Sequence, residues 1–164
     1  MKLNPITILT AVALSFITSM VSAQVSRTDS TVIFFAKTQI DSAFNPAMNP
    51  EKVGRLLGSS KNAASYLVVV RTKPGDVEIH EHWDDVVIIR SGGGVLRTGR
   101  VAVGQKSNGA EPFRDWMGGE IKDVKERILS PGDFIVIPAM MPHQYIPKKG
   151  QSLAYWTIKV PKPQ

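Results

Sequence analysis

Short alternations of apolar and polar residues dominate the chain from Ser65 onward. Glycine and proline interrupt them, for example at Gly75 and Pro131. This pattern is typical of β-strands joined by turns. It predicts an all-β sandwich or barrel over residues 65–160. The expected strands cover residues 65–72, 76–82, 85–91, 94–104, 126–130, 133–139, 143–146 and 153–160.

An arm made of one strand and one short helical segment is predicted over residues 24–64. Residues 31–37 (TVIFFAK) have the composition of a strand. Residues 49–58 carry helix boundary signals, because Asn49 can cap a helix, Pro50 suits its first position and Gly58 can end it.

Residues 1–23 have the composition of a secretory signal peptide. Lys2 supplies a positive start, residues 6–17 form an apolar run, and VSA at 21–23 fits a small-x-small cleavage pattern. The alternative is a membrane anchor, but the apolar run is short. We expect a mature chain that starts at Gln24, is secreted or periplasmic, and has no membrane association, since no other segment could span a bilayer.

The composition narrows the chemistry of any site. The chain has 164 residues and no cysteine, so disulfides and thiolate ligands are excluded and a metal would have to be held by histidine and carboxylates. The formal net charge is +6, but the basic residues are scattered and no basic run lies beside aromatics. We therefore expect no nucleic-acid partner.

The segment GDVEIHEHWDD, residues 75–85, holds two of the three histidines of the chain. Residues two apart in a strand share a face, so His80 and His82 are expected to project together, roughly 6 to 7 Å apart along the backbone. Two imidazoles at this separation can bind one ion. By itself, however, the pair also fits an ordinary surface strand.

The spacing in this segment resembles the first motif of the cupin superfamily. Gly75 precedes His80 with four residues between them, where the family has five. Asp85 precedes Gly92 by the six-residue gap that follows the family's glutamate, although only two residues separate it from His82. Asp85 therefore stands in for that glutamate.

The second cupin motif is matched around the third histidine. Gly132, Pro138 and His143 have the spacing of that motif. Met140 stands where the family has a glycine, and Pro147 where it often has an asparagine. The resemblance covers about residues 65–160 and implies a double-stranded β-helix, the jelly-roll cupin barrel, with a short N-terminal helical segment.

The resemblance also implies a metal site formed by His80, His82, Asp85 and His143. Asp85 has a shorter side chain than glutamate. It could bind the ion directly, bind it through water, or contact a metal ligand without touching the ion. Such ligands suit divalent Fe, Mn, Ni or Zn, and ligand type does not choose among them. The family often dimerises, which implies a homodimer in which residues 31–37 could pair with a neighbouring subunit.

Three functions fit these residues. The leading one is a metal-dependent enzyme of the dioxygenase type, an oxidoreductase acting on a small oxygen-rich organic molecule. The second is an isomerase, lyase or decarboxylase in which Glu78 or Tyr145 moves a proton, since alternation places both on the faces of the histidines. The third is a secreted module that binds a sugar or other small ligand. The fold alone does not separate them.

Three of these features have plainer interpretations. Glu78 could be a carboxylate at the rim in solvent, and Tyr145 a core tyrosine. Residues 104–123 are longer than a hairpin requires and could form a lid with Arg114 available to a substrate carboxylate. We favour the alternative, a surface excursion whose aromatics pack back on the sheet or on a second subunit.

Overall fold

The protein is described by a computed structural model, which covers residues 32–45, 54–59, 64–109 and 114–162. Every described helix and strand lies in the unit Phe34–Gln164. The predicted signal peptide at 1–23 lies outside the described residues. In chain order the elements are α1 (Lys37–Phe44), β1 (Gly54–Ser59), β2 (Ser65–Arg71), β3 (Glu78–His80), β4 (Trp83–Ser91), β5 (Gly94–Thr98), β6 (Val101–Val103), β7 (Lys106–Asn108), β8 (Asp115–Met117), β9 (Glu120–Lys122), β10 (Lys125–Leu129), β11 (Phe134–Ile137), β12 (His143–Pro147) and β13 (Leu153–Pro161).

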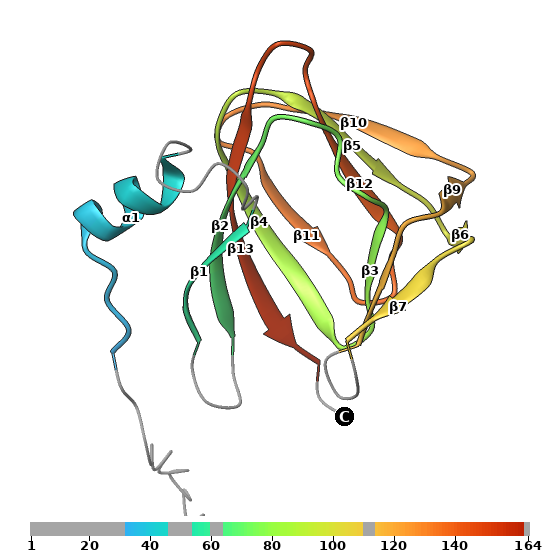
Figure 1. Ribbon diagram of the computed structural model, residues 1–164, viewed down its shortest axis with the longest axis horizontal. Helices are drawn as coiled ribbons and strands as arrows, with labels where there is room; N and C mark the ends of the chain where they lie inside the picture. The colour runs from blue at the N-terminus through green and yellow to red at the C-terminus, as the bar shows by residue number, and fades with distance from the viewer. Residues whose placement is uncertain (1–31, 46–53, 60–63, 110–113, 163–164) are drawn as a thin grey trace, which may run out of the picture. The chain divides into compact units, whose positions relative to one another are not determined.

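Two large antiparallel sheets make up most of this unit (Figure 1). Sheet A has the order β1-β2-β13-β4-β11, and sheet B the order β10-β5-β12-β3-β8-β7. A third, two-stranded sheet pairs β6 with β9. The non-consecutive neighbours, such as β13 between β2 and β4, mean that strands far apart in sequence lie side by side. The all-β prediction is confirmed.

The main hydrophobic core draws side chains from both sheets. Period-two alternation in β4 turns Val87 and Ile89 inward, where they are 0% and 1% exposed, whereas Ile88 between them is 36% exposed. Sheet B contributes Leu96 and Tyr145 to the same cluster. Each fully buried aliphatic side chain stabilises the fold by about 1.5–3 kcal/mol. Asp85 continues the inward face of β4, and so the strand points a carboxylate into the interior.

Helix α1 begins at the last residue of the segment that the sequence predicted to be a strand. Residues 32–36 are in no strand and the helix begins at Lys37, so the strand prediction for 31–37 is wrong over its described part. Ile40 and Phe44 lie one turn apart on the face that packs on Val68 of β2. The side chain of Arg55 donates to carbonyls of the last helical turn, including that of Ser42 at 3.2 Å, which also accepts from the amide of Asn45. These hydrogen bonds hold the end of the helix.

Strand β1 lies where the sequence predicted the end of a helix. Asn49 and Pro50 lie outside the described residues, but Gly54–Ser59 is extended and pairs with β2, so the helix prediction for 49–58 is wrong over its described part. The pairing supplies hydrogen-bond partners to the backbone of β2 on the side away from β13. A bulge between Leu56 and Gly58 interrupts the register.

The excursion at 104–123 extends the sheets. Strand β7 pairs with β8, β8 pairs with β3, and β9 pairs with β6. Arg114, expected to be available to a substrate carboxylate, donates from Nε and Nη2 to the two carboxylate oxygens of Glu81, at 2.7 and 2.9 Å. The described part of this segment therefore forms sheet strands, with Arg114 paired to Glu81, while the packing expected of its aromatics stays a prediction. Among the described residues, none of the helices has the length and hydropathy needed to cross a membrane.

Candidate metal centre

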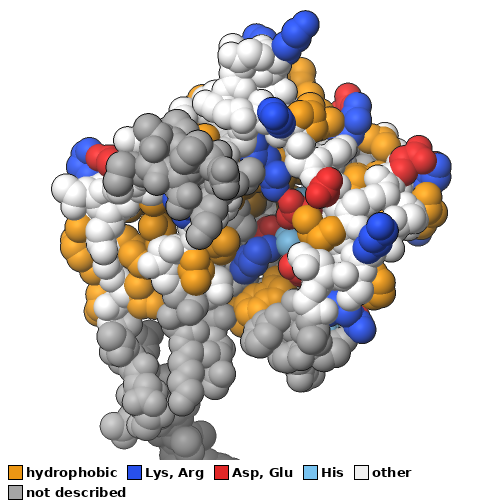
Figure 2. Space-filling view, in the orientation of Figure 1, with side chains coloured by type: hydrophobic (Ala, Val, Ile, Leu, Met, Phe, Trp, Pro, Cys, Tyr) orange, Lys and Arg blue, Asp and Glu red, His pale blue; other side chains and the backbone are white. Residues whose placement is uncertain are grey.

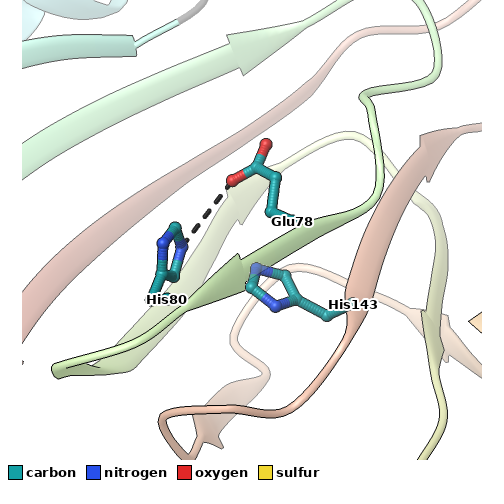
Figure 3. Close-up of side chains that lie close together, drawn as sticks. All are labelled: Glu78, His80 and His143. Carbon is teal, nitrogen blue, oxygen red and sulfur yellow. Dashed lines mark ion pairs between the residues drawn. The ribbon is translucent and has the colours of Figure 1, made fainter. Parts of the chain in front are cut away.

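Glu78, His80 and His143 come together between the sheets (Figure 3). Each offers one ligand atom, and these atoms lie within 4.8 Å of one another. Glu78 and His80 share a face of β3 by alternation, and His143 on β12 is the direct cross-strand partner of Glu78. The two histidines are only 5% and 1% exposed. Neighbouring strands, rather than loops, therefore position all three side chains.

The ring of His143 presents a bare nitrogen to this cluster. Nδ1 lies 3.0 Å from the carbonyl oxygen of Met141, which can only accept, so Nδ1 carries the proton and donates. Burial, together with the charge of the nearby His80, lowers the pKa of His143 and keeps the ring neutral. Nε2 is buried and has no hydrogen-bond partner among the described residues. Its lone pair is therefore available to a metal ion.

His80 is held by carboxylates on both sides of its ring. Nδ1 lies 2.9 Å from Oδ1 of Asp115, and Nε2 lies 3.2 Å from Oδ2 of Asp85. Burial opposes the charged ring, but the hydrogen bonds to Asp115 and Asp85 outweigh it and raise the pKa of His80 to about 9. Nζ of Lys159 also lies 2.8 Å from Nε2. A metal ion at Nε2 therefore has to displace positive charge, either a proton or this ammonium.

Asp85 faces the histidines from the opposite sheet. Its Oδ2 lies 3.9 Å from Nε2 of His143, and its Oδ1 accepts from Nζ of Lys159 at 3.0 Å. Burial opposes its ionisation, but the hydrogen bond with His80 and the charge of Lys159 prevail and lower the pKa of Asp85 to about 2. The carboxylate is therefore charged at neutral pH and lies beside both imidazoles.

Glu78 is oriented by a buried arginine. Nη2 of Arg71 donates to Oε1 of Glu78 at 2.6 Å, and Nε of Arg71 donates to the hydroxyl of Tyr155 at 2.8 Å. The other oxygen, Oε2, lies 3.7 Å from Nε2 of His80, as the dashed line in Figure 3 shows. One oxygen of Glu78 is thus fixed by the protein while the other faces the histidines. The rim interpretation of Glu78 does not fit this position.

His82 is not part of this group. Strand β3 ends at His80, residues 81 and 82 form a bend, and the next strand begins at Trp83. The bend breaks the two-residue alternation on which the shared face of His80 and His82 depended. The backbone carbonyl of His82 accepts from the amide of Lys162 at 2.8 Å. The structure therefore groups Glu78, instead of a third imidazole, with His80 and His143.

A cavity of about 160 Å³ adjoins the cluster. Figure 2 shows acidic, basic and histidine side chains gathered in a hollow at the centre of this face. Tyr145 stacks on Tyr155 with ring centroids 4.7 Å apart. The hydroxyl of Tyr145 is buried and has no hydrogen-bond partner among the described residues. The polar side chains lining the cavity are those of Arg71, Glu78, Asp85, Tyr145, Tyr155, Thr157 and Lys159.

Sequence reasoning missed three residues of this site. Asp115 reaches His80 because β8 pairs with β3, and Lys159 reaches Asp85 because the two are direct cross-strand partners. Arg71 ends β2 on the side of the cavity. The only sequence signal for any of these three residues was the alternation along residues 153–160, which places Lys159 on the same strand face as Tyr155 and Thr157. The pairings that bring the three residues to the site are not local.

Met140 closes the turn that leads to His143. It has a positive φ of 64°, a conformation that glycine adopts most readily, and it stands where the cupin motif has glycine. Its amide donates to the carbonyl of His80 at 2.8 Å. Met140 therefore adopts a backbone conformation that favours glycine, and its hydrogen bond ties the turn before β12 to the end of β3.

The donor set of the cluster fits a divalent metal ion. His143 presents an unprotonated nitrogen, and the Nδ1 atom of each histidine is held by an oxygen acceptor, which fixes the orientation of the ring. Glu78 adds a carboxylate, and Asp85 lies beside it. Two imidazoles with one or two carboxylates suit Zn, Fe, Mn or Ni, so the structure leaves the identity of the ion as open as the sequence did.

The comparisons with known proteins concern the fold. No family model matches the chain, and no curated protein matches it. A solved protein from Bacillus halodurans is 17% identical with a TM-score of 0.55, covering 80% of this chain and 82% of that one. One from Thermus thermophilus is 18% identical with a TM-score of 0.52, covering 79% and 98%. An uncharacterized Klebsiella pneumoniae protein with a double-stranded β-helix domain is 16% identical with a TM-score of 0.52, covering 80% and 91%. The predicted double-stranded β-helix is thereby confirmed.

Proposed function

We propose that this chain, which has the double-stranded β-helix fold of the cupin superfamily, is a metal-dependent enzyme acting on a small oxygen-rich molecule. The observation that carries the proposal is the buried Nε2 of His143, which has no partner among the described residues and lies beside Glu78 and His80. A buried polar atom without a partner costs about 1–3 kcal/mol. A bound ion would remove that cost.

Glu78, His80 and His143 would hold the ion, with Asp85 binding it directly or through water. When bound, a divalent ion supplies positive charge that polarises an oxygen atom of the substrate. Arg71 keeps Glu78 in place through their 2.6 Å hydrogen bond. The cavity of about 160 Å³ has the space of about five waters at roughly 30 Å³ each, so it takes a small substrate.

The groups beside the cavity favour a redox-neutral reaction through an enolate or similar oxyanion, as in an isomerase, lyase or decarboxylase. Burial raises the pKa of Tyr145 well above its usual value, so its hydroxyl stays protonated and can donate a hydrogen bond to a substrate oxygen that gains negative charge. The ammonium of Lys159 is a second hydrogen-bond donor at the cavity wall. The second candidate is the dioxygenase-type reaction expected from the sequence, which needs O₂. Only the set of metal-ligating side chains supports it.

Metal analysis tests the ligand assignment. Protein purified without added metal should contain close to one equivalent of a divalent transition metal, and His143→Ala and Glu78→Gln should lose most of it. His82→Ala is the matched control and should keep its metal, because His82 lies in the bend outside the cluster. Loss of metal in His82→Ala with retention in Glu78→Gln would reverse the assignment in favour of three histidines.

Oxygen dependence separates the reaction classes. Turnover of small hydroxy or keto acids under anaerobic conditions would support the redox-neutral reaction. Oxygen uptake with catechols, flavonols or β-diketones would support the dioxygenase class instead. Tight binding of a small ligand that survives His80→Ala, without turnover, would support the binding-module alternative from the sequence.

A further inference from the structure

The ammonium of Lys159 lies at the atoms that would bind the metal. Its Nζ is 2.8 Å from Nε2 of His80 and 3.0 Å from Oδ1 of Asp85. Protein–metal bonds to nitrogen and oxygen are about 2.0–2.2 Å long. An ion bound to Nε2 of His80 would therefore lie in the space next to this ammonium. The two cations cannot both keep their contacts.

The position of Lys159 is determined by the sheet. Lys159 on β13 is the direct cross-strand partner of Asp85 on β4, so both side chains extend from the same face of sheet A. Their side chains are 21% and 5% exposed. A lysine this close to a buried carboxylate neutralises it in the absence of metal, and it also keeps Asp85 aimed at the histidines.

We propose that Lys159 competes with the divalent metal for His80 and Asp85, and that the displaced ammonium then binds an anionic group of the substrate. The inference rests on the proposed function, since it requires metal binding at this cluster. It adds the substrate class: a small molecule that carries a carboxylate or another oxyanion.

The charges of the cavity support an anionic substrate. Two cations, Arg71 and Lys159, face two carboxylates, Glu78 and Asp85, around the cavity. A divalent ion adds two positive charges, and Asp115 behind the ring of His80 offsets only one of them. Buried charge without a partner is costly. An anionic substrate would supply the missing negative charge and would pair with the ammonium that the metal displaces.

Calorimetric titration with Ni²⁺ tests the competition. In the absence of small carboxylates, Lys159→Met should bind Ni²⁺ at least tenfold more tightly than the wild type, because no ammonium has to be displaced. The matched control is Lys122→Met, which removes an exposed lysine that pairs with Glu120 on β9 and should bind as the wild type does. Equal or weaker affinity in Lys159→Met would overturn the inference.

A second variant guards against misfolding. Lys159→Gln keeps a hydrogen-bond donor near Asp85 without the charge, and it should also bind Ni²⁺ more tightly than the wild type. Thermal melting without metal identifies a variant that has lost its fold. The Ni²⁺ affinity of the variant that remains folded then tests the competition. If neither the wild type nor a folded variant binds Ni²⁺, the proposed function fails and the inference fails with it. If all bind Ni²⁺ equally, only the inference fails.

The substrate class is tested by repeating the titration with acetate and with acetamide, its neutral isostere, at constant ionic strength. Binding energies are reciprocal, so an anion that binds beside the metal must tighten Ni²⁺ binding. Acetate should raise the Ni²⁺ affinity of the wild type relative to acetamide, and the effect should disappear in Lys159→Met. An acetate effect of the same size in both proteins, or in neither, would rule out Lys159 as the anion-binding group.

Discussion

Tyr145 and Tyr155 form a pair in which the same substitution should have opposite effects on stability. The rings stack with centroids 4.7 Å apart and an interplanar angle of 24°. Tyr155 accepts a hydrogen bond from Arg71 at 2.8 Å, whereas the buried hydroxyl of Tyr145 has no partner among the described residues. Replacing each by phenylalanine removes one hydroxyl and little else.

The expected magnitudes follow from hydrogen-bond energetics. A buried polar group without a partner costs about 1–3 kcal/mol, so Tyr145→Phe should raise the free energy of unfolding of the metal-free protein by about 1 kcal/mol or more. Tyr155→Phe should lower it by about 1–3 kcal/mol, because the buried guanidinium of Arg71 loses an acceptor. If Tyr145 serves the substrate, Tyr145→Phe should also reduce turnover at saturating substrate, a trade of activity for stability.

Urea unfolding of the metal-free proteins, followed by tryptophan fluorescence, measures both changes under one condition. The slope of the unfolding free energy against urea should be the same for the wild type and the two variants, so that the midpoints compare stability directly. A lower midpoint for Tyr145→Phe would refute the reasoning, since it would mean that the hydroxyl has a stabilising partner in the metal-free protein.

Three further predictions concern the rest of the site. Asp115→Ala should weaken Ni²⁺ binding about 10–100-fold in calorimetry, because Nδ1 of His80 loses the oxygen that orients the ring; unchanged affinity would show that Asp115 does not orient it. Met140→Gly should be neutral or stabilising by up to about 1 kcal/mol in urea unfolding, because glycine adopts a positive φ without strain. The control Met141→Gly should lower the free energy of unfolding. Equal losses in the two variants would argue against strain at Met140. Asp85 has a folded pKa of about 2 against an ordinary 3.8, so its stabilising effect of about 2 kcal/mol is full above about pH 4 and is lost as the pH falls through 2. Urea unfolding at pH 5 and pH 2 should show this loss in the wild type and less of it in Asp85→Asn; an equal loss in both would locate the acid sensitivity elsewhere.

The fold was predictable because its signal is local. Val87 and Ile89 alternate with less buried neighbours along β4, and a period of two in several short segments suffices to indicate antiparallel sheets. The wrong secondary-structure predictions arose where helix-boundary residues were given more weight than the spacing of apolar residues. Asn49 and Pro50 suggested a helix that would continue through β1, while the apolar spacing of Ile40 and Phe44, which does form a helix, was overlooked. Export and a homodimer remain predictions of the sequence.

The candidate site was predictable only in part, because its partners meet through long-range pairing. His80 and His143 were found from motif spacing, and Glu78 from alternation within one strand. The bend at residues 81 and 82 interrupts the alternation directly after the end of β3, and the sequence pattern does not reveal where β3 ends. Lys159 and Asp85 are 74 residues apart, and only the register of β13 on β4 brings them together. A single sequence does not specify that register.

Two buried polar atoms without hydrogen-bond partners belong to neighbouring side chains of one strand. Nε2 of His143 and the hydroxyl of Tyr145 belong to rings whose centroids are 5.9 Å apart on β12, and neither atom has a hydrogen-bond partner among the described residues. Each costs stability that an apolar side chain would not. Buried polar atoms without a hydrogen-bond partner are expected at functional sites, because a bound ligand supplies the missing partner. An ion at His143 and a substrate oxygen at Tyr145 would satisfy both atoms together, which a barrel serving only as a structural domain would not require.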